Sequence, residues 1–579
     1  MSAQVHVPVV AAPRTDALVT FPDGRTFSAP LGTPLLAYVQ AAYPPDHPEQ
    51  PILAGLIGNR LVELTYPIKS DVRVQPITLR HSDGGRIYRR TLVLVLTTAA
   101  AELFGCQIAV KHSIPSGGFY CEVVGRENFS RAELEQLRDY MAQIIAADEP
   151  ITRYEMPLSE AIAWFEQHGD QAMLRLLKHR EKDYLTVYRL RGTLDYFFGY
   201  MAPSTGCLRL FELIGAEEGF VLRYPRPETP DRLLPYQPSH KLEAVFHQHK
   251  VWQRLIGLED IGELNDAVRN GRFREEVLIA EALHTRYLDE IARQIVLAHQ
   301  RGTRLVLIAG PSSSGKTTTS KRLAVQLMAY GIKPYTLEMD NFFVERSRTP
   351  RDENGEYDFE ALGAMDLERL NHDVKALIQG QRVQLPYFDF KTGKPRDGEI
   401  VRLSEDQIII AEGIHGLNPE LLPEVDSERV LRVYVSLLTA LNLDLHNRVA
   451  TTDVRLLRRI IRDAAKRGYS AEQTLDRWES VRRGEKRNIF PYQENADMIF
   501  NSGLAYELAV LKPFAEPLLR RVDPDSPRYV EAKRLLAFLE WVSAASAEYV
   551  PDNSLLREFI GGSILETYMP YKRERGLSS

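Results

Sequence analysis

Eight consecutive residues near the middle of the chain have the types and the spacing of a phosphate-binding loop. Residues 310–317 fit the pattern G-x-x-x-x-G-K-[ST] at every fixed position. In such a loop, backbone N–H groups converge on phosphate oxygens, and the following helix N-terminus adds positive potential. Lys316 would reach the β- and γ-phosphates of ATP, and the Thr317 hydroxyl would bind Mg²⁺. The residues expected to bind ATP here are Gly310, Pro311, Ser312, Ser313, Ser314, Gly315, Lys316, Thr317 and Thr318.

The flanking residues supply the elements that this loop requires. Residues 304–309 are an apolar run of strand length, and residues 318–331 read as a helix that stops at Gly331. An ordinary glycine turn is the alternative. The strand before the loop and the helix after it favour phosphate binding.

Two carboxylates follow predicted buried strands. The strand 335–339 ends at Asp340, and the strand 407–413 contains Glu412 near its end. Both would lie at the ligand edge of a parallel sheet. There Asp340 could take a proton from an attacking hydroxyl, and Glu412 could order Mg²⁺ directly or through water. The structural alternatives are a cap for Asp340 and a salt bridge for Glu412.

Arginines are dense between residues 455 and 467. Helical spacing predicts that Arg455, Arg459 and Arg462 lie near one face. A solvated surface is the alternative, but arginine forks suit phosphate oxygens. We therefore expect a lid that closes over the phosphates.

Bulk composition narrows the class of protein. The chain has 579 residues, is 44% hydrophobic and carries a net charge of −6, which argues against a general nucleic-acid coat. Three scattered cysteines exclude a disulfide framework and favour a reducing cytoplasm. No leader and no 18-residue apolar run is present, so we expect a cytoplasmic protein without membrane partners.

The order of predicted elements indicates a multidomain α/β protein. The residue pattern predicts a hairpin around Gly58, an apolar helix at 91–104, a helix at 130–147 with Ser130 as N-cap and Glu133 three residues on, and a long amphipathic helix at 273–300. We expect a small α/β unit at the N-terminus, a unit of mixed helices and strands in the middle, and a parallel sheet flanked by helices in the C-terminal part. The expected divisions are a tail at 1–16, the small α/β unit at 17–80, the mixed unit at 81–225, a linker and helical segment at 226–302, a nucleotide-binding domain at 303–520, and a helical appendix at 521–579.

Residues 303–510 resemble the uridine kinase and phosphoribulokinase family of P-loop kinases, most closely its uridine kinase branch. The resemblance rests on several motifs in the same order. They are the phosphate loop, Asp340, Tyr357-Asp358, the segment 386–390, the segment 412–414, and the arginines of 458–467. It implies transfer of the γ-phosphoryl group of ATP, with Mg²⁺, to an alcohol.

The resemblance also implies individual roles. Asp340 would be the base toward a 5′-hydroxyl, Asp358 would bind ribose, and Glu412 would serve the metal. Arg459 would approach the substrate, and Arg462 and Arg467 would close over the ATP phosphates.

Several substrate-side positions depart from the family pattern. Phe388 stands where a base-contacting tyrosine is expected, and Phe343 lacks the hydroxyl of its counterpart. Gly393 aligns near a base-reading histidine, and Tyr469 replaces an arginine. We therefore expect a nucleoside kinase of uncertain base specificity, since the polar groups that read uridine are missing.

The front half resembles threonyl-tRNA synthetases. Residues 17–80 look like their TGS domain, which implies a β-grasp fold, and the matching segments are 21–24, 32–35 and 58–64. Residues 81–225 look like their editing domain, which implies an α+β fold, and the matching segments are 103–105, 117–120 and 203–206. The four positions of the editing site align with Arg90, Leu94, Phe197 and Met201, none of which is a plausible zinc ligand. We expect neither editing nor aminoacylation, and we expect the old cavity to be filled.

The full arrangement resembles bacterial TGS-linked nucleoside kinases. The leading hypothesis is an ATP- and Mg²⁺-dependent kinase whose acceptor is a nucleoside, with another small alcohol as the near alternative. The second hypothesis is a nucleotide-regulated RNA- or tRNA-binding protein that uses the TGS-like half. RNA contact, a regulatory ligand and self-association all stay open for the front half.

Overall fold

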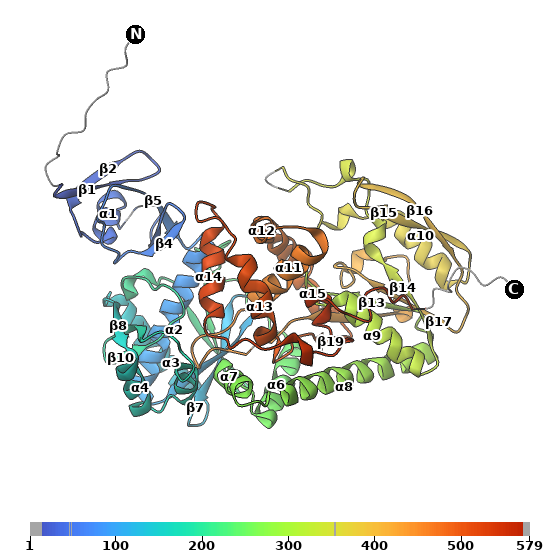
Figure 1. Cartoon of the computed structure of the whole chain (residues 1–579), viewed down its shortest axis with the longest axis horizontal. Coiled ribbons are helices and arrows are strands. Elements are labelled where there is room, and N and C mark those ends of the chain that lie inside the picture. The colour runs from blue at the N-terminus through green and yellow to red at the C-terminus, as the bar shows by residue number, and fades with distance from the viewer. Residues whose placement is uncertain (1–13, 46, 48, 353–354, 440, 571–579) are drawn as a thin grey trace, which may run out of the picture.

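The structure is a computed structural model that describes residues 14–570, apart from 46, 48, 353, 354 and 440. Most of the predicted tail, residues 1–13, lies outside the described residues. Figure 1 shows a small sheet at one end of the molecule, a parallel sheet near the other, and C-terminal helices between them. No helix in the described part of the chain is long and apolar enough to cross a membrane.

The first sheet is a mixed five-stranded sheet packed on one short helix. Its strand order is β2-β1-β5-β3-β4, with β1 and β5 parallel and the other pairs antiparallel. The predicted hairpin around Gly58 joins β3 to β4. The elements are β1 (Asp16–Thr20), β2 (Thr26–Pro30), α1 (Leu35–Ala42), β3 (Ile52–Ile57), β4 (Arg60–Glu63) and β5 (Val72–Thr78).

The middle region contains two antiparallel sheets around a long central helix. That helix, α2, begins well before the predicted start at residue 91, because His81 caps it by accepting from the Asp83 amide. Ser130 and Glu133 form the predicted capping box of α3. The helices are α2 (Ser82–Phe104), α3 (Arg131–Ala146), α4 (Leu158–Gln167) and α5 (Gln171–Leu177).

One of these sheets has the order β11-β12-β7-β6, and the other has the order β10-β9-β8. The strands are β6 (Gln107–Ile114), β7 (Gly118–Val124), β8 (Thr152–Pro157), β9 (Tyr184–Leu190), β10 (Thr193–Asp195), β11 (Glu212–Ala216) and β12 (Gly219–Arg223). Three helices then lead to the third region, α6 (His240–Ile256), α7 (Ile261–Arg269) and α8 (Phe273–Gln300). The long amphipathic helix predicted for 273–300 is confirmed.

The third region is built on a five-stranded sheet in which every pairing is parallel, in the order β14-β17-β13-β18-β19. The strands are β13 (Leu305–Ala309), β14 (Lys333–Glu338), β17 (Gln407–Glu412), β18 (Val430–Ser436) and β19 (Met498–Asn501). A hairpin of β15 (Val383–Asp389) and β16 (Lys394–Val401) lies beside it. The strands predicted before the phosphate loop, Asp340 and Glu412 are all present.

Helices surround this sheet, and the last ones return toward the middle region. They are α9 (Lys316–Ala329), α10 (Leu367–Ile378), α11 (Thr451–Arg467), α12 (Ala471–Asn488), α13 (Glu507–Leu519), α14 (Tyr529–Leu539) and α15 (Arg557–Ile560). The segment after residue 521 is only partly helical, because turns separate α14 from α15.

The loop between β18 and α11 fastens the parallel-sheet region to the middle region. Asn442 donates to the Val110 carbonyl at 3.0 Å, and Asn447 donates to the Tyr196 carbonyl at 2.9 Å. His446 lies 2.5 Å from Asp195 across the same boundary. The loop is therefore held by residues that are distant in sequence.

The His446 contact is strongly charged. Burial opposes the protonated imidazole, but Asp195 and Asp444 outweigh it and raise the pKa of His446 to about 9. Burial and the neighbouring carboxylates raise the pKa of Asp444 to about 7. Both groups thus bind protons more tightly in the folded chain than in the unfolded chain.

This cluster predicts a pH-dependent stability. A histidine whose folded pKa is raised stabilises the fold fully below about pH 6.5 and loses that contribution as pH rises through about 9, here about 3 kcal/mol. The melting temperature of the full chain should fall between pH 6.5 and 9. His446→Gln should flatten this slope, whereas His240→Gln, at an exposed position, should leave it unchanged. Equal slopes in wild type and His446→Gln would contradict the assignment.

Candidate active site

The loop after β13 can follow its path only with glycine at two positions. A Cβ on Gly310 would lie 1.9 Å from the Val435 carbonyl oxygen of the neighbouring strand. Gly315 has φ 86° at the N-terminus of α9, in the left-handed region that side chains disfavour. Ser313, between them, also has a positive φ of 57°. The loop therefore bends tightly over the end of the sheet, as a phosphate-binding loop does.

Lys316 and Thr317 begin α9 directly after this bend. The Lys316 ammonium donates to the Pro311 carbonyl at 3.1 Å, and the Thr317 hydroxyl donates to Glu412 Oε1 at 2.8 Å. Glu412 reaches Thr317 because β17 is the parallel neighbour of β13, with Ile308 and Glu412 in register. A hydroxyl beside a carboxylate is an oxygen donor set that fits Mg²⁺.

Asp340 lies at the end of β14, on the other side of β17. Glu338 and Glu412 are in register across these two strands. Asp340 is exposed, yet surrounding protein desolvates it and raises its pKa, while Lys316 acts in the opposite direction. Burial likewise raises the pKa of Glu412 to about 7, against the effect of Lys316. The predicted base, metal partner and phosphate-loop lysine thus share one electrostatic environment.

A further carboxylate in this environment, Glu360, was missed from the sequence. Burial and Glu485 raise the pKa of Glu360 to about 7, and Arg459 and Lys316 oppose the shift. A Cβ on Gly484 would lie 2.4 Å from the Glu360 Cβ, so the α12 backbone packs directly on this residue. The only feature of the sequence that could have pointed to Glu360 as a site residue is its position two residues after Asp358.

Asp358 itself has a different set of contacts. Its carboxylate is 3.2 Å from Arg487 and accepts the Glu360 amide at 3.1 Å. Its role toward ribose stays a prediction.

The arginines of α11 fall into two groups. Arg455 and Arg458 are buried and paired, with Glu485 at 2.6 Å and with Glu507 at 2.7 Å. Arg455 also donates to the Ser312 carbonyl at 2.9 Å, so it supports the phosphate loop. Of the three arginines predicted to share one face, Arg455 therefore has a structural role, whereas Arg459 and Arg462 are not bound up in such a buried pair with the described residues.

The second group of arginines surrounds a single carboxylate. Arg459, Arg462 and Arg467 lie 3.3, 3.4 and 3.2 Å from Asp463, and each is predicted to act at the site. Arg459 also donates to the Ser312 hydroxyl at 2.7 Å. Three cations around one buried anion leave excess positive charge beside the loop, which suits a polyphosphate.

Two carboxylates already bind amides of the loop. Glu485 accepts the Ser312 amide at 2.9 Å. Glu558, from the C-terminal segment, accepts the Thr318 amide at 3.3 Å and the Thr318 hydroxyl at 2.7 Å. Amides in the first turn of such a helix are the groups that bind phosphate. Glu558 therefore takes a position that a phosphate would need.

The segment that carries Glu558 is docked along α9. A Cβ on Gly315 would lie 2.7 Å from the Leu555 side chain. Lys321 donates to the carbonyls of Leu565 at 2.8 Å and Glu566 at 3.0 Å. No feature of the sequence indicates that the C-terminal appendix covers the phosphate loop.

Aromatic rings gather on the acceptor side of Asp340. Phe343 and Phe388 have ring centroids 5.8 Å apart, and Phe390 lies 5.1 Å from Phe388. Phe388 is buried and Phe390 is exposed. The two predicted substrate-side phenylalanines are therefore neighbours and offer ring faces and edges rather than hydrogen bonds.

The four positions expected to replace the editing site lie in packed core. Leu94, Phe197 and Met201 are each at most 3% exposed. Arg90 donates to the Tyr200 carbonyl at 3.1 Å. These contacts agree with a filled cavity. No cluster of three or more His, Cys, Asp or Glu side chains suited to a metal ion occurs among the residues that the structure describes.

The two halves of the chain are similar to different groups of known proteins. The N-terminal half matches threonine–tRNA ligases. The ligase of Acidovorax sp. (strain JS42) is 29% identical over 295 residues, covering 50% of this chain and 42% of the ligase. That of Laribacter hongkongensis (strain HLHK9) is 31% identical over 199 residues, covering 34% and 31%. The chain thus spans less than half the length of these relatives.

The C-terminal half matches a different group. A solved structure described as a possible uridine kinase from Bacillus stearothermophilus is 22% identical, covers 37% of this chain and 96% of its own, and has a TM-score of 0.26. A model of the Phosphoribulokinase / Uridine kinase family matches residues 305–509. Residues 305–509 therefore match the phosphoribulokinase and uridine kinase family, and the half of the chain before them is similar to threonine–tRNA ligases.

Proposed function

We propose that this protein is an ATP-dependent kinase that transfers the γ-phosphoryl group to a hydroxyl of a nucleoside, with the identity of the base left open. The observation that carries the proposal is the meeting of Lys316, the Thr317–Glu412 pair and Asp340 at the carboxyl ends of three adjacent parallel strands. Ligands of open parallel sheets bind at this edge. Phosphoryl transfer depends mainly on positioning and on charge stabilisation, which these groups supply.

In the proposed reaction, Asp340 orients the acceptor hydroxyl and takes its proton as the alcohol oxygen attacks the γ-phosphorus. The bond from that phosphorus to the β-γ bridging oxygen breaks, and ADP leaves. The raised pKa of Asp340 makes its carboxylate a stronger base than an ordinary aspartate. Lys316 and the arginines Arg459, Arg462 and Arg467 balance the charge that develops on the phosphate oxygens.

Thr317 and Glu412 would hold Mg²⁺, which neutralises phosphate charge when it is bound. Their hydrogen bond at 2.8 Å places the two oxygen donors side by side. Phe343 and Phe388 would form the acceptor wall. Because these rings offer no hydrogen-bond donors or acceptors, they could contact a nucleoside but could not select uridine through hydrogen bonds to its base.

RNA binding through the N-terminal half is the second candidate function. The similarity of that half to threonine–tRNA ligases favours it. RNA binding should weaken steeply with salt and should show no turnover that depends on an alcohol. Self-association and a cytoplasmic location also remain proposals.

Asp340→Asn tests the chemistry. The amide cannot accept the proton, so nucleoside-dependent ADP formation should fall by roughly a hundredfold or more. ATP binding, measured by calorimetry, should remain. Asp406→Asn, at an exposed turn, is the matched control and should keep full activity. A panel of nucleosides supplies the acceptor, and full turnover in Asp340→Asn would refute the assigned base.

Lys316→Ala tests the phosphate site. Loss of the ammonium should abolish transfer and weaken ATP binding, while circular dichroism and melting temperature stay near those of wild type. Lys391→Ala, in an exposed turn, is the control. Retained turnover in Lys316→Ala would show that the loop is not the ATP site.

Glu558→Gln tests whether ATP must displace the C-terminal segment. Glutamine can still accept the Thr318 hydrogen bonds but carries no charge to repel phosphate, so ATP affinity should rise by about five- to tenfold. Glu548→Gln, at an exposed position in the same segment, should bind ATP like wild type. Measurable but unchanged affinity in Glu558→Gln would contradict this competition.

A further inference from the structure

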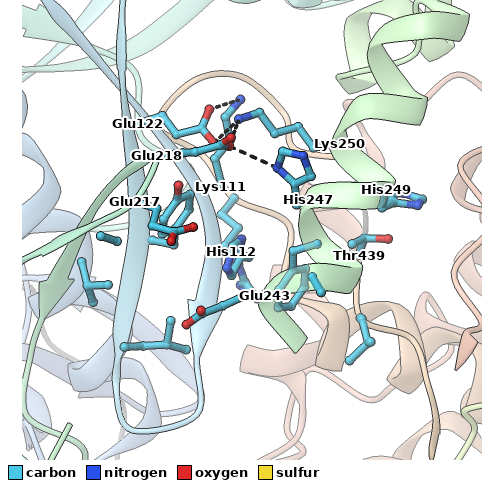
Figure 2. A pocket seen from close by; sticks show the side chains of 18 of the residues that line it. Lys111, His112, Glu122, Glu217, Glu218, Glu243, His247, His249, Lys250 and Thr439 are labelled. Atoms are coloured by element: carbon cyan, nitrogen blue, oxygen red, sulfur yellow. Dashed lines mark hydrogen bonds and ion pairs between the residues drawn. The ribbon is translucent and has the colours of Figure 1, made fainter. Parts of the chain in front are cut away.

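A cavity of about 740 Å³ lies between the middle region and the parallel-sheet region, away from the phosphate loop. Its walls come from β6 and β7, from α6, and from the segment 438–451 that leads into α11. Figure 2 shows the strands on one side and α6 on the other. This volume and this place at a boundary between regions are typical of small-molecule sites.

Ion pairs between α6 and the strands hold one end of the cavity in place. Lys250 lies 2.6 Å from Glu122, and His247 lies 3.2 Å from Glu218 (Figure 2). Lys250 also approaches Glu218, at 3.6 Å. These carboxylates are therefore neutralised by the protein itself and do not set the charge that a ligand would meet.

An aromatic stack joins the same two walls. The His112 ring is sandwiched between Phe246 of α6, at 3.8 Å, and Tyr120 of β7, at 4.9 Å. Burial lowers the pKa of His112 to about 3, so the ring is neutral at physiological pH. The stacked rings therefore connect α6 to the strands on the other side of the cavity and add no charge to it.

Arg448 provides a cation that forms no close ion pair with the described residues. It lines the cavity and donates to the Ser113 hydroxyl at 3.0 Å. Within the described ranges, no carboxylate lies within 4 Å of its guanidinium. Burial lowers its pKa to about 10, and the nearby Arg89 acts in the same direction, whereas Tyr224 and Asp453 oppose the shift. A guanidinium fork in such surroundings binds oxyanions well.

The N-terminus of α11 lies close to Arg448 in the sequence, since the helix begins at Thr451. Its N-cap is Ala450, which provides no side-chain cap, and Thr451 also lines the cavity. The first amides of this 17-residue helix therefore add positive potential at the place where Arg448 lies. The first turn also carries Asp453, whose charge is balanced by Arg534 at 2.7 Å. Two independent elements thus favour an anion at the same end.

Carboxylates on the facing walls give the cavity a second polar end. Glu217, in the turn between β11 and β12, forms no hydrogen bond or ion pair with the described residues. Glu243 of α6 has His240 at 3.7 Å as its ion-pair partner. Figure 2 shows both side chains beside His112. They can accept hydrogen bonds from hydroxyl or amino groups of a ligand.

We propose that this cavity binds a small organic phosphate, with the phosphate on Arg448 and the N-terminus of α11, and with hydroxyl or amino groups on Glu217 and Glu243. A phosphate offers several charged oxygens to an arginine fork and to helix amides together, whereas a neutral sugar brings no charge to either group. The site does not depend on the kinase assignment, because none of its residues contacts the phosphate loop.

Hydrogen–deuterium exchange of the full chain tests the site with ribose 5-phosphate as the probe. We expect protection of residues 107–124 and 240–256 in wild type and in Lys316→Ala, where the phosphate loop is disabled. Arg448→Gln should raise the dissociation constant at least about tenfold and remove this protection. Arg131→Gln, whose side chain is 94% exposed, should bind like wild type. Free ribose should give no protection.

Glu217→Ala keeps the test decisive even where Arg448→Gln disturbs the fold. This variant should weaken ribose 5-phosphate binding severalfold and leave inorganic phosphate binding unchanged, because only the former carries the ribose hydroxyls that would donate to Glu217. The proposal fails if ribose 5-phosphate protects only residues 310–320, if protection persists in a folded Arg448→Gln, or if ribose protects as well as its phosphate.

Discussion

A buried ion pair stabilises the backbone conformation of the phosphate loop. Arg455 and Glu485 are each at most 2% exposed, and both bind the backbone of one loop residue. Arg455 donates to the Ser312 carbonyl, and Glu485 accepts from the Ser312 amide. The pair joins α11 and α12 to the loop, and Glu360 packs on the residue next to Glu485. Removing either partner would leave a buried charge uncompensated, at a cost of about 3–5 kcal/mol.

The parts of the site that local sequence determines were predictable. The loop, Asp340 and Glu412 each follow a short apolar strand, and the parallel order of these strands brings their carboxyl ends together. Even the hydroxyl–carboxylate contact of Thr317 and Glu412 follows from strand register. Such features need only the period of a strand and the rule that a parallel sheet binds ligands at one edge.

The parts that depend on long-range packing were not predictable. Glu485 and Glu558 reach the loop from 173 and 240 residues away, and an isolated glutamate in a helix carries no sign of its partner. The division of the α11 arginines into buried and open groups likewise depends on Glu485 and Glu507. The periodicity of a helix shows which residues share a face but not which face meets a buried acid.

The loop between β18 and α11 has a consequence for dividing this chain into pieces. A fragment limited to residues 303–520 would keep every motif of the kinase family yet lose Asp195 and Tyr196 as partners of His446 and Asn447. It would also lack Leu555, which covers Gly315. We therefore expect residues 303–520 to fold stably only with the front half and the C-terminal segment in the same polypeptide.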